Sequence, residues 1–248
     1  MRFAGQSIIV TGGSRGIGSA LVLALAREGA RVLFTYQRDS ASAERTLAAV
    51  AAAGGTADSL RADASESASS DAMVAACLDR WGRVDGLVCN AGITDDAPFV
   101  RMSAAQWQRV IAANLSSVFY AYRAALPPMR AQRYGRIVSI GSLAGLAANL
   151  GQANYAAAKS GLVGLTRALA REVAADGITA NVVAPGYVET EMLSGISAAQ
   201  RAWALNAIAI GRFATVDEVV PAISFLLGRE ASYITGQVLA IDGGWVMP

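Results

Sequence analysis

Tyr155 and Lys159 lie four residues apart, and Ser142 lies thirteen residues before Tyr155. At that spacing the tyrosine and the lysine share one face of a helix. A phenol with its usual pKa near 10 is a poor acid at neutral pH, but a cation about 5 Å away contributes about 3 kcal/mol, or about two pKa units. We therefore expect Lys159 to lower the pKa of Tyr155, so that the phenol can donate a proton to a carbonyl oxygen.

Two further side chains fit such a site. Ser142 follows an apolar run and can donate a hydrogen bond to the same carbonyl oxygen. Asn114 immediately precedes a helical pattern at Leu115, where its side chain can bend the helix start and hold a water that passes protons towards Lys159. Simpler interpretations exist: a surface pair on a helix, a turn serine and an N-cap asparagine. The four residues together, in this order, favour proton transfer.

A glycine-rich segment near the start of the chain favours nucleotide binding. It follows an expected strand at 7–11 and precedes an expected helix at 17–28. Its small residues let the backbone approach a pyrophosphate, and the helix N-terminus supplies partial positive charge. The candidate cofactor residues here are Gly12, Ser14, Arg15, Gly16, Ile17 and Gly18. A tight turn without a ligand is the simpler alternative.

The end of the second expected strand indicates which dinucleotide binds. An NAD-specific site usually places an acid there, whereas this strand ends at Tyr36 and no acid precedes Asp39. Arg15 and Arg38 can meet a 2′-phosphate by charge-assisted hydrogen bonds, which favours NADPH; alternatively Arg38 is a solvated loop residue. Asp63, after the third strand, can accept a bond from the adenine amino group or cap the next helix.

The elements that position these residues alternate between short apolar runs and longer helical patterns, which indicates a single-domain, doubly wound (Rossmann) α/β fold with a parallel seven-stranded sheet and helices on both faces. Strands are expected at 7–11, 31–36, 56–62, 84–89, 135–140, 178–183 and 237–241, and long helices at 115–131 and 155–175. No linker divides residues 1–248. The irregular segment 187–210 follows a strand and is a candidate substrate lid; an ordinary surface helix pair is the alternative.

Composition excludes several function classes. The 248 residues are 54% apolar and 16% charged, with a formal net charge of +2, too balanced to argue for nucleic acid. The sequence has no histidine, which excludes a Ser-His-Asp hydrolase and a histidine-based metal site. Cys77 and Cys89 are expected to be buried free thiols in a reducing cytoplasm. We expect no signal peptide and no membrane span.

These residues resemble the short-chain dehydrogenase/reductase family over essentially the whole chain. The matching motifs are Thr11 to Gly18, Asp63, Asn90-Ala91-Gly92, Asn114, Ser142, Tyr155-x3-Lys159 and Pro185-Gly186. The resemblance implies that Asn114, Ser142, Tyr155 and Lys159 form a catalytic tetrad. It also implies that Asn90, Ala91 and Gly92 form a structural turn beside the cofactor, and that Pro185, Gly186, Val188 and Thr190 hold the nicotinamide carboxamide.

Within the family the chain looks most like bacterial β-ketoacyl-acyl-carrier-protein reductases, for example at Gly151 to Lys159 and Asn181 to Gly186. That likeness implies NADPH-dependent reduction of a β-ketoacyl thioester in fatty acid biosynthesis and a homotetramer. The implied contacts are the two long helices and the C-terminal strand. An acyl carrier protein is a possible partner.

The chain departs from these reductases at the positions expected to grip an acidic carrier near the pocket mouth. Arg133 matches one basic position, but Asp176 stands at the other and Asp95-Asp96 where a basic residue is frequent. These acids should weaken carrier docking by about 1 kcal/mol per unfavourable pair, or they are simply solvated. A coenzyme A thioester therefore stays open. The broader alternatives are a dehydrogenase acting on another secondary alcohol or ketone (sugar, steroid, polyol) and a non-catalytic nucleotide-binding protein.

Overall fold

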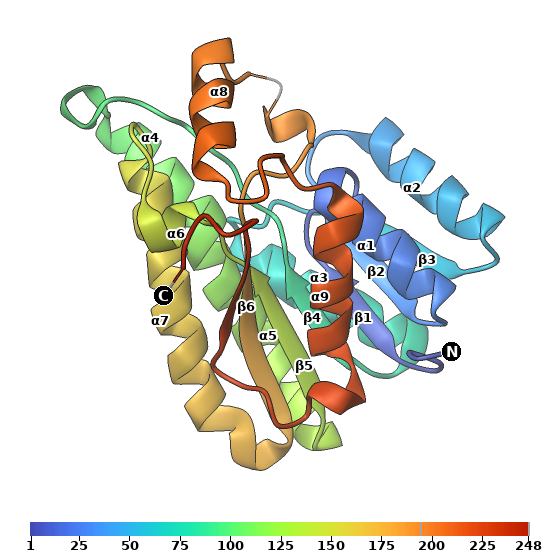
Figure 1. Cartoon of the computed structure of the whole chain (residues 1–248). Coiled ribbons are helices and arrows are strands. Elements are labelled where there is room, and N and C mark those ends of the chain that lie inside the picture. The colour runs from blue at the N-terminus through green and yellow to red at the C-terminus, as the bar shows by residue number, and fades with distance from the viewer. Residues whose placement is uncertain (194, 248) are drawn as a thin grey trace.

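The computed structural model describes residues 1–193 and 195–247. Within them, seven parallel strands form one sheet in the order β3-β2-β1-β4-β5-β6-β7 (Figure 1). The strands are β1 (Ser7–Val10), β2 (Arg31–Tyr36), β3 (Thr56–Arg61), β4 (Gly86–Cys89), β5 (Gly135–Ile140), β6 (Ile178–Pro185) and β7 (Val238–Ile241). The expected doubly wound fold is confirmed, with small shifts in bounds: β4 begins at Gly86 rather than at residue 84, and β6 continues to Pro185.

Helices cover both faces of the sheet. They are α1 (Gly16–Arg27), α2 (Ser40–Ala52), α3 (Ser67–Trp81), α4 (Ala104–Ile111), α5 (Ser117–Gln132), α6 (Ala144–Ala147), α7 (Ala153–Val173), α8 (Ala198–Ala207) and α9 (Val216–Leu227). α1 packs between α2 and α9 on one face, and α5 packs against α3 and α7 on the other. Because both faces are covered, the central strands are apolar throughout rather than alternating.

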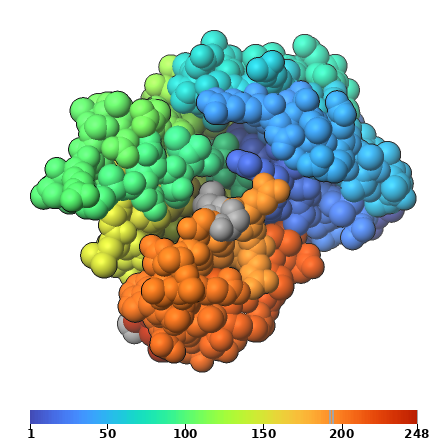
Figure 2. All heavy atoms as spheres, turned by 90° about the horizontal axis from the view of Figure 1, so that it is seen from above, coloured from blue at the N-terminus to red at the C-terminus, as the bar shows by residue number. Residues whose placement is uncertain are grey.

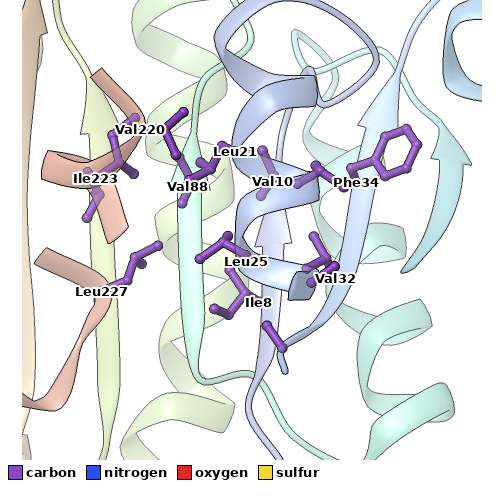
Figure 3. Packing of buried hydrophobic residues seen from close by; sticks show 14 of the residues in the cluster. Ile8, Val10, Leu21, Leu25, Val32, Phe34, Val88, Val220, Ile223 and Leu227 are labelled. Carbon is purple, nitrogen blue, oxygen red and sulfur yellow. The ribbon is translucent and has the colours of Figure 1, made fainter. Parts of the chain in front are cut away.

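Two large buried clusters, one on each face of the sheet, make up most of the core, and a small third one surrounds Ala204, Ile208 and Phe213. In the first, α1 and α9 pack on β1, β2 and β4 (Figure 3). Leu21 of α1 lies beside Val10 of β1, and Leu25 lies beside Ile8 of the same strand (Figure 3). Ile223 of α9 belongs to the same cluster. Burying one such side chain contributes about 1.5–3 kcal/mol. The second cluster joins α3, α5 and α7 to the opposite face, so the strand ends that carry the candidate site rest on packed layers.

Asn114 lies in a π-helical turn (Ala112–Ser116) between α4 and α5, not at a helix start. Its buried carboxamide donates to Val110 O and Ile93 O, both at 2.9 Å, and accepts from Ile93 N at 3.2 Å. The N-cap interpretation is therefore wrong, because α4 runs into α5 without a break and begins at a capping box on Ser103. The expected bend is present as the π-helical turn. In this wider turn the Asn114 side chain donates to the Val110 carbonyl.

The chain order reverses between β1 and β4, and the loops after the strands gather at this carboxyl-terminal edge, where α/β sheets bind ligands. α8 rises above that edge (Figure 1). Seen from above, the orange segment around α8, the green segment near residue 100 and the blue N-terminal half surround the middle of this face (Figure 2). In the candidate lid 187–210, residue 194 lies outside the described residues, and the described ones contain a short 3₁₀ turn (Glu191–Leu193) and the helix α8.

Candidate active site

The glycine turn after β1 is interlocked with the turn after β4. Asn90 Nδ2 donates to Thr11 O at 3.1 Å and Gly12 O at 2.8 Å. In return, the Thr11 hydroxyl accepts from Asn90 N at 3.0 Å and Ala91 N at 3.1 Å. Gly12 has φ 67°, and a Cβ built on Gly18 would lie 2.2 Å from Gly12 O. These two positions therefore require glycine, one for its backbone angle and one for the close approach.

The N-terminus of α1 fits a pyrophosphate. Arg15 is its N-cap in extended conformation and provides no side-chain cap, so the first-turn amides remain available for an anion. Ser14, Gly16 and Ile17 belong to the same turn. The structure thus places all of the expected glycine-turn residues where a dinucleotide would lie, and the fit rests on this uncapped helix end and the glycine cradle.

The loop after β6 closes over the glycine turn. Gly186 N donates to Ile241 O at 2.9 Å, which ties the end of β6 to β7, and Pro185 is the last residue of β6. Val188 is buried and pairs with Ala214. Beyond it, Thr190 Cγ2 would lie 3.5 Å from a Cβ on Gly16. The loop expected on the nicotinamide side is therefore brought directly against the nucleotide turn.

At the other end of this edge, Tyr36 ends β2, Arg38 follows two residues later, and Asp63 lies after β3. Asp63 accepts from Ser65 N at 2.9 Å and Ser65 Oγ at 2.6 Å, and from Gln37 Nε2 at 2.5 Å. α3 begins only at Ser67, so Asp63 forms a turn before the helix rather than capping it. These hydrogen bonds, that with the Ser65 hydroxyl above all, hold the pKa of the Asp63 carboxyl below its usual value.

Ser142 and Lys159 converge from different elements on the end of β5. Lys159 is buried on α7, and its ammonium donates to Ile140 O at 2.7 Å. The Ser142 hydroxyl accepts from Ala144 N at 3.1 Å, so the serine is also a turn residue. Tyr155, one turn earlier on α7, is partly buried, and the Lys159 ammonium lies 5.6 Å from its ring centroid. The ammonium keeps two further hydrogens for other acceptors.

The pKa of Tyr155 is raised, not lowered. Burial is the largest cause, a hydrogen bond with Ser142 opposes part of the rise, and the Asp96 carboxylate adds to it. Burial also lowers the pKa of Lys159 to about 8. The expected lowering by Lys159 is therefore wrong for this arrangement, because desolvation of the phenolate outweighs a cation already bonded to a carbonyl. The consequence is a phenol that stays protonated at neutral pH.

Asn114 and Lys159 meet beside Gly92. A Cβ built on Gly92 would lie 2.4 Å from Asn114 Oδ1 and 3.7 Å from Lys159 Nζ. Both side chains thus approach the same point, and any larger residue at position 92 would displace them. The asparagine and the lysine therefore both lie against the turn after β4.

Comparison with known proteins agrees with this geometry. A family model described as enoyl-(acyl carrier protein) reductase matches residues 12–246. The chain belongs to the short-chain dehydrogenase/reductase family. It is 44% identical to the 3-oxoacyl-[acyl-carrier-protein] reductase FabG of Escherichia coli (strain K12), with all of both chains covered. It is 42% identical to the 3-oxoacyl-[acyl-carrier-protein] reductase of Synechocystis sp., over 98% of this chain and 97% of that one.

A solved structure has the same fold. The crystal structure of levodione reductase superposes with a TM-score of 0.93 at 34% identity, covering 98% of each chain. Membership of the short-chain dehydrogenase/reductase family means a nicotinamide cofactor and an oxidoreductase acting on a CH–OH or C=O group. Within the described residues, no helix is long and apolar enough to cross a membrane, and no group of three metal-ligating side chains gathers.

The acids expected at the mouth of this reductase-family site are partly neutralised. Asp95 accepts from Gln106 Nε2 at 2.9 Å and forms an ion pair with Arg109. Asp96 accepts from Gln152 Nε2 at 2.8 Å, which ties it to the N-terminus of α7. Because Asp95 is already paired with Arg109, we expect it to repel an acidic carrier less than an unpaired carboxylate would.

Arg133 does not lie at the mouth of its own chain's site. It ends α5 just before β5 begins, and Asp176 just precedes β6, so both lie at the opposite, amino-terminal edge of the sheet. Asp176 forms ion pairs with Arg130 at 2.9 Å and Arg133 at 3.3 Å. The prediction that Arg133 lies near the pocket mouth is wrong for the site of the same chain. Arg133 lies where parallel strands begin, whereas the site lies at the opposite edge of the sheet, where they end.

One signal in the sequence is easily overlooked. Lys159 is the only lysine among the 21 basic residues of the chain; the other basic residues are arginines. An arginine cannot lose its proton in a protein, whereas a buried lysine shifts its pKa readily. A single lysine placed beside the tyrosine therefore points to the one position where a titrating cation is needed. The Thr11 hydroxyl, which binds the turn after β4, is a second residue whose part only the structure shows.

Proposed function

We propose that this chain catalyses the NADPH-dependent reduction of a β-ketoacyl thioester, carried by acyl carrier protein or coenzyme A, to the 3-hydroxyacyl product. The observation that carries the proposal is the meeting of Ser142, Tyr155 and Lys159 at the end of β5, opposite the uncapped N-terminus of α1. The relatives named as 3-oxoacyl-[acyl-carrier-protein] reductases support the substrate class, since they match over the full length.

Each residue of the site has a distinct role in the proposed reaction. When bound, a reduced nicotinamide would supply the hydride for the keto carbon. Tyr155 donates the proton to the keto oxygen, and Ser142 donates a hydrogen bond that polarises it. Lys159 holds ribose hydroxyls with its free hydrogens, and Asn114 supports proton resupply. Because the pKa of Tyr155 is raised, the phenol is protonated at neutral pH and carries the proton that a carbonyl must receive.

The choice of NADPH rests on the residues directly after β2. Asp39, the first acid there, caps α2 through Ser42 N at 2.9 Å and also bonds the Ser42 hydroxyl. It is therefore engaged away from a ribose 2′-hydroxyl, while Arg38 lies beside the end of the strand. We expect a higher kcat/KM with NADPH than with NADH, and a preference for NADH would reject this assignment. The remaining proposed cofactor contacts are those of the glycine turn, Asp63, the turn after β4 and the loop after β6.

Replacing Tyr155 with phenylalanine tests the mechanism. We expect turnover to fall about a thousandfold, the range by which a positioned general acid accelerates a reaction, while the Kd for NADPH stays within about twofold. Stopped assays for turnover and fluorescence titration for binding measure the two quantities separately. Near-normal turnover in this variant would remove Tyr155 from its role.

Reduction or oxidation of another secondary alcohol or ketone is the second candidate, and the likeness to levodione reductase favours it. Kinetics on acetoacetyl-coenzyme A, a carrier-linked β-ketoacyl thioester and a panel of cyclic ketones and alcohols separate the two. Faster turnover of the cyclic compounds would support the second candidate. A non-catalytic role has no support, because all four expected catalytic residues are present. We further propose a homotetramer and a substrate lid at 187–210.

A further inference from the structure

A cleft of about 390 Å³ opens at the carboxyl-terminal ends of β2 and β3. It is lined by Gln37, Arg38, Arg61, Ala62, Asp63, Glu66 and Ser69. The volume suits part of a nucleotide, and the cleft lies where the adenosine end of a dinucleotide would reach. Arg38 was expected here from the sequence. Arg61, the last residue of β3, was not.

Arg61 is held in place by the loop that precedes Arg38. In the sheet it pairs with Tyr36 of β2, and its Nε donates to Gln37 O at 3.1 Å. Among the described residues, its two terminal nitrogens have no hydrogen-bond or ion-pair partner, and neither has the Arg38 guanidinium. Two guanidinium groups therefore line one cleft, and nine of their ten donor hydrogens have no acceptor among the described residues.

Two carboxylates line the cleft beside these arginines, and the charges of Asp63 and Arg38 attract each other. Both oxygens of Asp63 are hydrogen-bonded to Ser65 and Gln37 and Glu66 is exposed at the N-terminus of α3, so neither acid holds the two guanidinium groups in an ion pair. Arg15, the other cation expected at a 2′-phosphate, does not line the cleft, and its guanidinium lies 3.4 Å from Glu191 Oε2. A phosphomonoester carries a charge of about −1.5 to −2 at neutral pH. Two guanidinium groups balance this charge, whereas a single one does not.

We propose that Arg61 is a specificity-determining residue that binds the 2′-phosphate of NADPH together with Arg38. The inference rests on the proposed function and deepens it: the end of β3, as well as the end of β2, selects the phosphorylated cofactor. Arg61 donates through its terminal nitrogens while its Nε stays on the Gln37 carbonyl, so the guanidinium plane is oriented before the ligand arrives.

Calorimetric titration with two adenosine ligands tests this without turnover. The ligands are adenosine 2′,5′-bisphosphate, which has the 2′-phosphate, and adenosine 5′-diphosphate, which lacks it. We expect Arg61→Gln to weaken the first five- to tenfold and to leave the second within twofold. Arg61→Lys should recover part of the loss, since it keeps the charge. Arg45→Gln, which removes an arginine of α2 that does not line the cleft, is the matched control and should leave the ratio of affinities unchanged.

Each other outcome overturns the assignment. An equal loss for both ligands in Arg61→Gln would mean that Arg61 only supports the loop through Gln37. An unchanged preference for the 2′-phosphate would mean that Arg38 and Arg15 suffice, and the proposal for NADPH would stand without Arg61. Equal binding of the two ligands by the unmodified protein would reject the NADPH assignment itself and Arg61 with it.

Discussion

At the scale of single residues, the site depends on one tyrosine and one lysine whose protons respond to burial. Burial raises the pKa of the Tyr155 phenol and lowers that of the Lys159 ammonium to about 8. Desolvation disfavours the charged form of each group, so the two shifts act in opposite senses. At neutral pH the result is a protonated phenol beside an ammonium, which is the state that ketone reduction requires.

The pH dependence of reduction follows from these shifts. Because burial lowers the pKa of Lys159 to about 8, the ammonium predominates near pH 6–7, is half deprotonated near pH 8 and is lost as the pH rises further. We expect kcat/KM for reduction to be constant near pH 6–7 and to decline above about pH 8, with a slope approaching one decade per pH unit. Steady-state kinetics from pH 6 to 10 measures this.

Because the chain has a single lysine, the pKa of Lys159 can also be measured directly, without using the reaction rate. Labelling with ¹³Cε-lysine produces one side-chain resonance, because Lys159 is the only lysine in the sequence. We expect its titration midpoint to match the decline in rate. A midpoint near the ordinary lysine value of about 10.4 would contradict the lowering of the pKa by burial. The decline in kcat/KM above pH 8 would then have to come from another titrating group.

At the scale of elements, backbone contacts between turns fix the positions of these side chains. The turns after β1 and β4 hold each other through Asn90 and Thr11, and the π-helical turn at Asn114 holds Ile93. Each contact joins segments that follow neighbouring strands. The nucleotide turn is therefore no flexible loop but part of a hydrogen-bonded layer across the top of the sheet.

Gly18 is the most sensitive position in this layer. A methyl group there would meet Gly12 O at 2.2 Å and Asn90 Nδ2 at 2.7 Å, and backbone cannot give way cheaply. We expect Gly18→Ala to lower the free energy of unfolding by about 1–3 kcal/mol and to weaken NADPH binding at least tenfold. Denaturant melts and cofactor titration check the two effects.

A control in the same helix separates stability from binding. Ala20→Gly, also in α1, should cost about 1 kcal/mol through helix propensity, yet it leaves the contact between the two turns unchanged. We expect its Kd for NADPH to stay within about twofold of the unmodified protein. If both variants weakened cofactor binding alike, general loss of stability rather than the glycine contact would be the cause.

At the scale of the whole molecule, several apolar side chains remain exposed where a second copy could cover them. Phe119 on α5 is 47% exposed, and Leu239 on β7 is 38% exposed. β7 is the last strand of the sheet, so one of its edges is unpaired among the described residues, and such edges are commonly covered by assembly. These two surfaces coincide with the contacts that the proposed tetramer would use.

Charge placed on each surface tests the assembly. We expect Phe119→Glu and Leu239→Glu each to reduce the tetramer to a smaller species, and the double variant to sediment as a monomer, because a glutamate buried in an apolar contact carries a large desolvation cost. Sedimentation velocity measures the species. Ala49→Glu, on the exposed side of α2, is the control and should leave the tetramer intact. A monomer in the unmodified protein would reject the proposal.

The local sequence determined most of the fold and supplied the residues of the proposed site. Apolar runs set the strands because parallel strands are buried on both faces. The spacing of Tyr155 and Lys159 set their shared helical face, and the order of Asn114, Ser142, Tyr155 and Lys159 named a proton-transfer site. These properties depend on residues that are close together in the sequence, so they can be predicted without knowing how the helices and strands pack.

Only the tertiary structure decided the properties that depend on distant neighbours. It put Asn114 in a π-helical turn, moved Arg133 and Asp176 to the far edge of the sheet, and brought Arg61 beside Arg38. It also reversed the expected pKa shift of Tyr155, because desolvation is set by every segment packed around the phenol. The burial of a side chain and its contacts with distant residues depend on how all the elements pack, so a short stretch of sequence does not determine them.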